Sequence, residues 1–133
     1  MARGEAMIAA GIGFNSQATA GEIVDLVQAA LSARRLSAED LSVLATELSK
    51  ASDGRAQRAA MVLAVPLLGL PREDLEAESA RAITSSQRVQ AIVGVPSVAE
   101  CAALAAAGAM PELLGARLAN GVATCALAKG GDA

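Results

Sequence analysis

The chain has 133 residues, a formal net charge of −3 and 53% hydrophobic residues, many of them alanine. This length favours a single domain, and we take residues 1–133 as one unit with an ordered core over about 6–128. Nucleic-acid binding is not expected, because the chain contains one aromatic residue and no clustered excess of Lys and Arg. The absence of histidine excludes Ser-His-Asp and Cys-His catalysis and histidine-ligated zinc.

No metal site and no cofactor are expected either. Cys101 and Cys125 lie in apolar stretches without ligand spacing, so we interpret both as small buried hydrophobic residues. The N-terminal apolar run is too short for a signal peptide and contains Glu5. No stretch approaches the roughly 20 apolar residues of a membrane span. We therefore expect a cytoplasmic protein that does not bind a membrane.

The predicted elements of the first half alternate between strand and helix, which indicates parallel strands joined by helical crossovers. One boundary is sharp: Thr19 and Glu22 form a capping box, so the first long helix begins at Ala20. In chain order, the predicted segments are a strand centred on 7–10 that ends in glycines, a helix over 20–35, a helical turn at 38–41, a strand at 42–46, a helix over 53–65 and a strand at 66–71.

Helices are predicted to continue in the second half. A helical turn over 72–75 is followed by a surface loop and then by a helix at 87–93, which Gly94 terminates. The next helix begins at Ser97, which forms a further capping box with Glu100.

The C-terminal segment changes to a strand pattern. Asn120-Gly121 lies between two apolar runs and favours a two-residue type I′ turn between antiparallel strands. The last four residues, 130–133, are expected to be disordered. The predicted fold class is therefore α/β: a single three-layer αβα domain whose mixed, mostly parallel sheet ends in an antiparallel C-terminal hairpin.

The glycine-rich stretch GIGFNSQAT is the first candidate site. It contains G-x-G without the third glycine of a dinucleotide fingerprint, which disfavours a nucleotide-binding module. Gly11 and Gly13 would let a ligand approach the main chain, and the helix that starts after Thr19 would offer N–H groups to an anion. The alternative is a tight strand-to-helix turn. For Phe14, two positions are open: at a pocket rim, or packed under the first helix.

The second candidate follows the second predicted strand and comprises Thr46, Glu47 and Lys50. Ligand sites of parallel α/β sheets lie beyond the carboxyl ends of the strands, so this segment should face the same crevice as the glycine-rich stretch. Lys50 would then pair with a ligand carboxylate. The alternative is a solvated lysine near the end of a strand.

Two further candidates lie near the C-terminus. Ser97 either offers its hydroxyl to a ligand or only caps its helix. Arg117 and Thr124 are placed on the C-terminal hairpin, where an arginine is as easily explained by an exposed strand edge.

Four stretches occur in a fixed order: GIGF followed by TAGEI, LATELSKAS, VGVPSVAECAALAAAG and NGVATCALA. Through them, residues 8–128 resemble the cobalamin-biosynthesis family formed by CobE and the C-terminal domain of CbiG. We expect the resemblance to be nearest to the stand-alone CobE form, because the N-terminal region of CbiG-type proteins is missing. The resemblance implies a role in cobalamin (vitamin B12) biosynthesis. It implies a precorrin or corrinoid as the small-molecule partner, and other enzymes of the pathway as further partners.

The chain departs from the family pattern in places where relatives carry positive charge. Relatives often have arginine where Asn15 and Ser16 stand here, so an anion held by this loop would rest on main-chain N–H groups. Of the lysine pair of the final strand, Arg117 keeps one positive charge and Ala119 loses the other. The residues assigned to ligand binding are Gly11, Gly13, Phe14, Asn15, Thr19, Thr46, Lys50, Ser97, Arg117 and Thr124.

Two functions are open from the sequence. One is a protein of the aerobic pathway that binds a precorrin or corrinoid and hands it on, without catalysis of its own. The other is a hydrolase or lyase acting on a precorrin lactone or side chain, as the resemblance to CbiG-type proteins implies. Glu47 or Lys50 would then be the acid–base group.

Overall fold

The computed structural model of the chain describes residues 6–82 and 97–131. The helix predicted at 87–93 and its terminating Gly94 lie outside these residues. The strands are β1 (Ala6–Phe14), β2 (Val43–Glu47), β3 (Leu67–Leu70), β4 (Ala109–Leu113), β5 (Leu118–Ala119) and β6 (Ala123–Gly131). The helices are α1 (Ala20–Ala33), α2 (Leu48–Ala51), α3 (Gly54–Leu63), α4 (Arg72–Ala77) and α6 (Val98–Ala106), with 3₁₀ turns η1 (Ala38–Asp40) and η2 (Ser79–Arg81).

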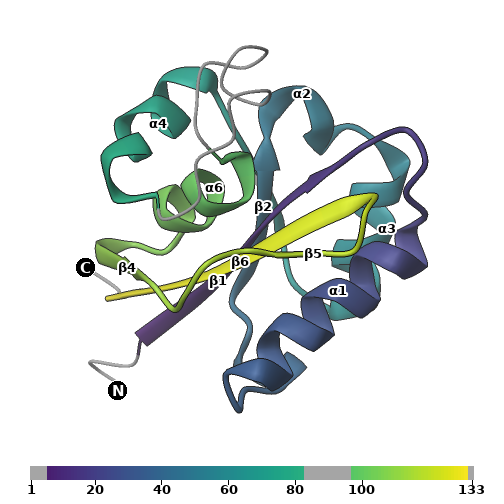
Figure 1. Cartoon of the computed structure of the whole chain (residues 1–133), viewed down its shortest axis with the longest axis horizontal. Coiled ribbons are helices and arrows are strands. Elements are labelled where there is room, and N and C mark those ends of the chain that lie inside the picture. The colour runs from purple at the N-terminus through teal and green to yellow at the C-terminus, as the bar shows by residue number, and fades with distance from the viewer. Residues whose placement is uncertain (1–5, 83–96, 132–133) are drawn as a thin grey trace.

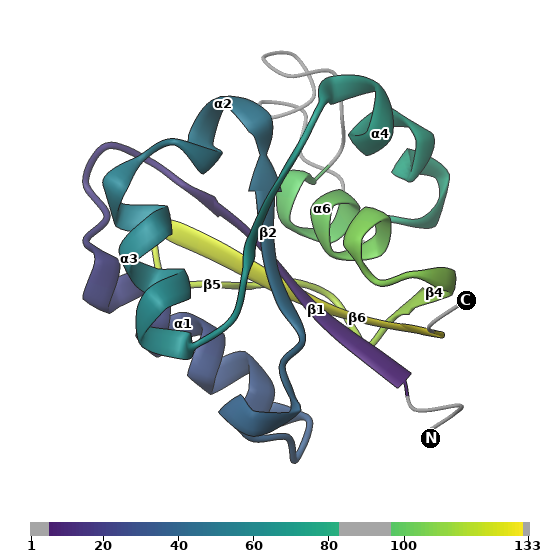
Figure 2. The same cartoon turned by 180° about the vertical axis from the view of Figure 1, so that it is seen from behind.

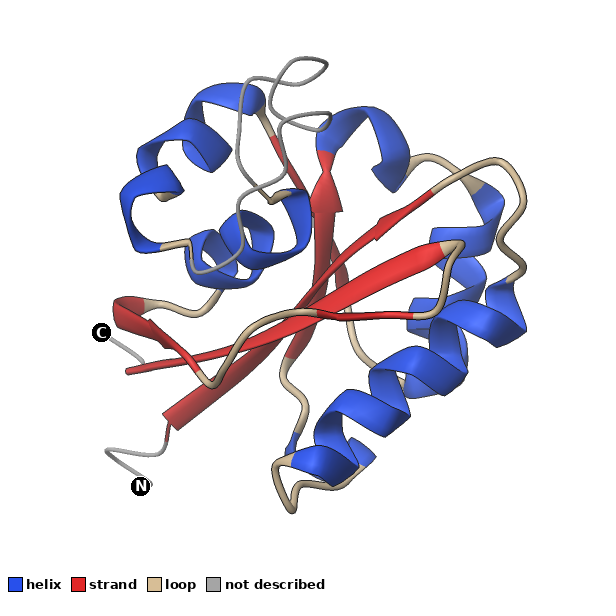
Figure 3. Cartoon of the chain, viewed as in Figure 1, coloured by secondary structure: helices blue, strands red, loops and turns tan. Residues whose placement is uncertain are grey.

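One mixed sheet lies between two helical layers (Figures 1 and 3). Its strand order is β3-β2-β1-β6-β4, and β5 also pairs with β6. β1, β2 and β3 are parallel, whereas β6 runs antiparallel to β1, and β4 and β5 run antiparallel to β6. Helices α1 and α3 cover one face, and α4 and α6 cover the other (Figure 2). The predicted three-layer α/β class is confirmed.

Helix α1 begins where the capping box predicts. Thr19 Oγ1 accepts a hydrogen bond from the Glu22 N–H at 3.1 Å, and the Thr19 N–H donates to Glu22 Oε1 at 2.9 Å. The apolar stripe of the helix then lies on the sheet, with Ile23 and Val27 fully buried. Burial of a side chain of this size contributes roughly 1.5–3 kcal/mol, so this stripe stabilises the layer.

Strand β1 runs through both glycines at which the predicted strand ends. It pairs with β6 from Ala6↔Gly131 to Phe14↔Ala123, so the stretch from Gly11 to Phe14 belongs to the strand and is not a glycine loop. Gly11 is needed for packing: a Cβ atom there would lie 2.0 Å from the Ala99 carbonyl oxygen of α6. The interpretation of these glycines as a loop or turn was wrong, because a glycine that admits a neighbouring helix has the same sequence signature as one that forms a turn.

The C-terminal hairpin is present, but its turn differs from the predicted type I′. That turn needs positive φ at both central residues, and of Asn120 and Gly121 only the glycine has it, at 94°. Asn120 instead accepts hydrogen bonds through Oδ1 from the N–H groups of Val122 and Ala123, at 3.1 and 2.8 Å. The asparagine side chain therefore closes a longer turn, as in an Asx turn.

Strand β6 also extends further than predicted, to Gly131. Gly130 packs so closely on the residue after α6 that a Cβ atom would lie 2.2 Å from the Ala107 carbonyl oxygen. The expected disorder of 130–133 is therefore wrong for the first two residues, and 132–133 lie outside the described residues.

Each face of the sheet has its own core, and the two differ in composition. The core under α1 and α3 contains Leu, Ile, Val and the ring of Phe14. The core under α6 is built mainly from alanine, which lets this helix lie close to the sheet. Cys101 and Cys125 are fully buried, one in each core, as predicted. Among the described helices, none has the length and apolar character needed to cross a membrane.

Candidate functional site

Side chains bridge β1 and β2 near their carboxyl ends. The main-chain ladder between these strands ends at Gly11↔Ala45. Beyond that pair, Thr46 Oγ1 donates a hydrogen bond of 2.9 Å to the Ile12 carbonyl, and Lys50 Nζ donates to the Phe14 carbonyl. The two strands therefore separate at this edge, and polar side chains from β2 and α2 satisfy the carbonyl groups of β1.

Phe14 is packed in the core and does not stand at a pocket rim. The residue is 6% exposed and belongs to the core under α1 and α3. Two cations lie over its ring: Lys50 Nζ is 4.6 Å from the ring centroid and Arg55 Cζ is 5.0 Å from it. Lys50 thus lies against the strand that carries the glycines, at the same sheet edge as the glycine-rich stretch. Its contact with a ligand stays a prediction.

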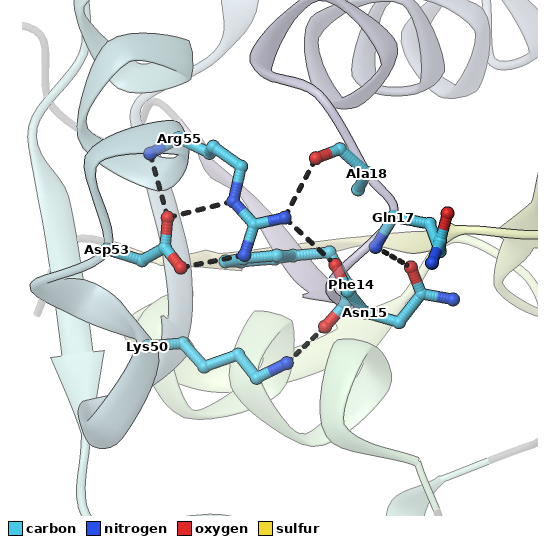
Figure 4. A network of polar contacts seen from close by, with 7 residues as sticks. All are labelled: Phe14, Asn15, Gln17, Ala18, Lys50, Asp53 and Arg55. Carbon is cyan, nitrogen blue, oxygen red and sulfur yellow. Dashed lines mark hydrogen bonds and ion pairs between the residues drawn. The ribbon is translucent and has the colours of Figure 1, made fainter.

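Arg55 links α3 to the β1–α1 loop, residues 15–19 (Figure 4). Its Nη1 donates to the carbonyl oxygens of Asn15 and Ala18, at 3.0 and 2.8 Å. Its Nε and Nη2 donate to the two carboxylate oxygens of Asp53, at 3.0 and 2.8 Å. These hydrogen bonds from Arg55 lower the pKa of Asp53 to about 2.

Sequence reasoning missed this pair. The pattern Asp53-x-Arg55 at a helix start is explained locally, because Asp53 also caps α3 by accepting from the Arg55 N–H at 2.9 Å. The carbonyl groups that Arg55 reaches lie about forty residues away in the chain, and no local pattern reports such a contact.

The β1–α1 loop already uses most of its main-chain N–H groups. The Asn15 N–H donates to the Val122 carbonyl at 2.9 Å and the Ala18 N–H to the Asn15 carbonyl at 3.3 Å. The Gln17 N–H donates to Asn15 Oδ1 at 2.8 Å, and the Thr19 N–H takes part in the capping box. The expectation that an anion would rest on N–H groups of this loop therefore gains little support. The exposed side chains of Asn15, Ser16 and Gln17 remain available.

A second group of candidates lies on the α6 side of the same edge. Gly13 pairs with Thr124, and a Cβ atom on Gly13 would lie 3.0 Å from Thr124 Oγ1 and 4.0 Å from the Cβ of Val98. All three residues are half-exposed. The first turn of α6 thus lies beside the bare main chain of Gly13 and the Thr124 hydroxyl.

Glu47 lies on this side of the sheet too. It is the last residue of β2 and pairs with Leu70, which packs in the core under α6. Its carboxylate accepts a hydrogen bond of 2.8 Å from the Ser49 hydroxyl. The sheet therefore separates Glu47, Gly13 and Thr124 from Phe14, which packs on the opposite face.

Ser97 caps α6, which is the simpler of its two predicted roles. Its fully buried side chain accepts a hydrogen bond of 3.2 Å from the Glu100 N–H. Glu100 is also fully buried, and its Oε2 accepts from the Arg117 N–H at 3.0 Å. Sequence reasoning treated Glu100 only as a capping residue and missed this contact, because 17 residues separate the partners.

Arg117 does not lie on a hairpin strand as predicted. It belongs to the loop between β4 and β5, one residue before β5 begins. The positive φ of Gly115 (144°) interrupts the apolar run, which is why one predicted strand becomes two. The contact with Glu100 holds Arg117 near the first turn of α6. Its main chain therefore lies near the second group of candidates.

Comparison with known proteins agrees with this architecture. Residues 8–128 match the family model described as cobalamin synthesis G C-terminus. Protein CobE from a Sinorhizobium species is 33% identical over 118 residues, which cover 89% of this chain and 77% of that protein. The crystal structure of CobE, a protein from the cobalamin (vitamin B12) biosynthetic pathway, superposes with a TM-score of 0.88 at 30% identity, covering 93% of this chain and 90% of that one.

Two further solved structures share the fold. Cobalamin biosynthesis protein chiG from Agrobacterium tumefaciens has a TM-score of 0.72 at 37% identity, over 92% of this chain and 97% of that one. A cobalamin biosynthesis protein G homologue from Sulfolobus solfataricus has a TM-score of 0.67 at 21% identity, over 92% of this chain and 36% of that one, a likeness of fold alone.

The fold and these matches define an α/β domain of the class found in cobalamin-biosynthesis proteins. The chain belongs to the cobalamin synthesis G C-terminus family, together with CobE. It is therefore a protein of the cobalamin-biosynthesis pathway.

Proposed function

We propose that this protein binds a precorrin or corrinoid intermediate at the carboxyl edge of β1 and β2 and hands it to another enzyme of the pathway, in the cytoplasm. The observation that carries the proposal is the bare main chain of Gly13 between Thr124 and the first turn of α6. A flat macrocycle needs a surface without a projecting side chain, and glycine provides one.

The chemistry of the surroundings suits a ligand with many carboxylate groups. The main-chain N–H of Arg117 donates to Glu100 next to this surface, and we infer that the guanidinium group faces the ligand. The Thr124 hydroxyl donates only a long hydrogen bond, of 3.5 Å, to the Gly13 carbonyl, so it is available to a ligand. Because the net charge of the chain is −3, attraction of an anion to this surface must come from a local positive group, and we assign this role to Arg117.

A titration tests the proposal. Hydrogenobyrinic acid is added to the protein and its absorbance is followed, first with the wild type and then with Arg117→Ala and Thr124→Val. Each variant should bind about ten-fold more weakly, since a hydrogen bond to a charged group contributes about 1.5–3 kcal/mol. Lys129→Ala is the matched control, because Lys129 is exposed at the far end of the same strand. If the absorbance does not change with wild-type protein at high micromolar concentration, the proposal is contradicted.

The second candidate function is a hydrolase or lyase acting on a precorrin lactone or side chain. The position of Glu47 favours it, because this carboxylate ends β2 on the side of the sheet that carries Gly13 and Thr124. Turnover of such a substrate by the isolated protein, abolished by Glu47→Gln, supports an enzyme. Binding without turnover supports the first function, in which the protein binds the intermediate and hands it on.

A further inference from the structure

The β1–α1 loop is shaped by a side chain from another part of the chain. Arg55 donates through one nitrogen, Nη1, to the carbonyl oxygens of both Asn15 and Ala18, the two ends of the turn. The turn itself closes through the Ala18 N–H, which donates to the Asn15 carbonyl. Arg55 thus binds the same carbonyl oxygen that accepts the hydrogen bond closing the turn.

The guanidinium group of Arg55 is itself fixed from two further directions. Asp53 binds its other edge through both carboxylate oxygens, and the Phe14 ring lies 5.0 Å from its central carbon (Figure 4). The planar fork of arginine makes these contacts at the same time, which the ammonium group of a lysine cannot do. The side chain is 31% exposed, so a small cation from solvent has access to its place.

These contacts leave Arg55 few groups for a ligand, although it lies beside a loop whose exposed side chains are candidates for ligand contact. We propose that Arg55 is a positioning residue: it holds the β1–α1 loop in the conformation that binds the ligand and does not touch the ligand itself. This inference rests on the proposed function for its binding part, whereas its conformational part stands on the geometry of the ligand-free protein.

The first test uses the ligand-free protein. ¹⁵N–¹H spectra of Arg55→Ala and Arg55→Lys should show displaced or broadened amide resonances for residues 15–19, with the rest of the fold unchanged. Arg58→Ala is the matched control, since Arg58 is exposed one turn further along α3. Loop resonances of Arg55→Ala at wild-type positions overturn the proposal. If this variant does not fold, Asp53→Asn, which keeps an oxygen for the helix cap, should displace the same resonances in smaller measure.

The second test measures the affinity for hydrogenobyrinic acid. Arg55→Ala should bind about ten-fold more weakly, Arg55→Lys should not restore binding, and millimolar ethylguanidinium should restore both the affinity and the loop spectrum of Arg55→Ala. Unchanged affinity in a variant with a displaced loop overturns the binding part of the proposal. If the wild type does not bind the acid, the proposed function and the binding part fail together. The loop spectra still decide whether Arg55 positions the loop.

Discussion

The hydroxyl of Thr46 donates a hydrogen bond of 2.9 Å to the main-chain carbonyl of Ile12, at the point where β1 and β2 stop pairing. Both residues are buried, so the bond replaces a contact that the main chain of β2 would otherwise make. The side chain spans the gap where the two strands separate, and α2 starts directly after Glu47. The candidate site at the carboxyl edge therefore depends on a polar side chain in the core.

Thr46→Val should lower the free energy of unfolding by about 1–3 kcal/mol, because it leaves the buried Ile12 carbonyl without its donor while preserving the shape of the side chain. Urea denaturation followed by circular dichroism measures the change. Ser49→Ala is the control, since its hydroxyl donates to Glu47 in an exposed hydrogen bond and its removal should change stability by less than about 0.5 kcal/mol. Equal stability of the two variants contradicts the assignment.

Gly11→Ala should destabilise the protein by about 3 kcal/mol, since overpacking of a core against main-chain atoms costs about 1–3 kcal/mol or more. The added Cβ would lie 2.0 Å from the Ala99 carbonyl and 2.5 Å from the Ala103 nitrogen, so α6 must move. Gly54→Ala is the matched control because nothing lies within 4 Å of its added Cβ. That variant should gain about 0.4–1 kcal/mol. A Gly11→Ala protein of wild-type stability would show that α6 lies further from β1.

The pair of Asp53 and Arg55 should make stability depend on acid pH. Folding lowers the pKa of Asp53 from its usual 3.8 to about 2, so the stabilisation is complete above about pH 4 and is lost as the pH falls toward 2. Thermal unfolding of wild type and Asp53→Asn between pH 5 and about 2 measures this dependence. The difference in melting temperature should shrink as the pH falls. Asp25→Asn, which removes an exposed carboxylate from α1, should show no such convergence. A constant difference across the range contradicts the prediction.

Both cysteines should be unreactive in the native protein. Burial raises the pKa of Cys101 to about 11 and that of Cys125 to about 12, so neither thiol forms appreciable thiolate at pH 8. A thiol-specific disulfide reagent should give no absorbance change with native protein and should detect two thiols in denaturant. Rapid reaction of one thiol in native protein would mean that its helix or strand opens locally.

Features that depend on neighbouring residues were predicted well. The start of α1 follows from Thr19 and Glu22, which lie three positions apart, so the capping box is complete within one turn. Features that depend on distant residues were not. The packing role of the β1 glycines was missed because the helix that needs their space begins more than eighty residues later, at Val98. The same holds for the candidate site. The sequence identified its segments, but not the long-range contact of Arg55 with Asn15.

By itself, the sequence determined the layers of this protein, because hydrophobic periodicity and capping are local and fix which segments are helices and strands. It also determined the family, through four short stretches in a fixed order. Only the tertiary structure decided what the polar residues do. Lys50 binds the Phe14 carbonyl, and the buried Glu100 binds the Arg117 N–H. Packing of the chain determines which buried polar groups still need a hydrogen bond and which side chains lie close enough to make it. No local sequence pattern contains that information.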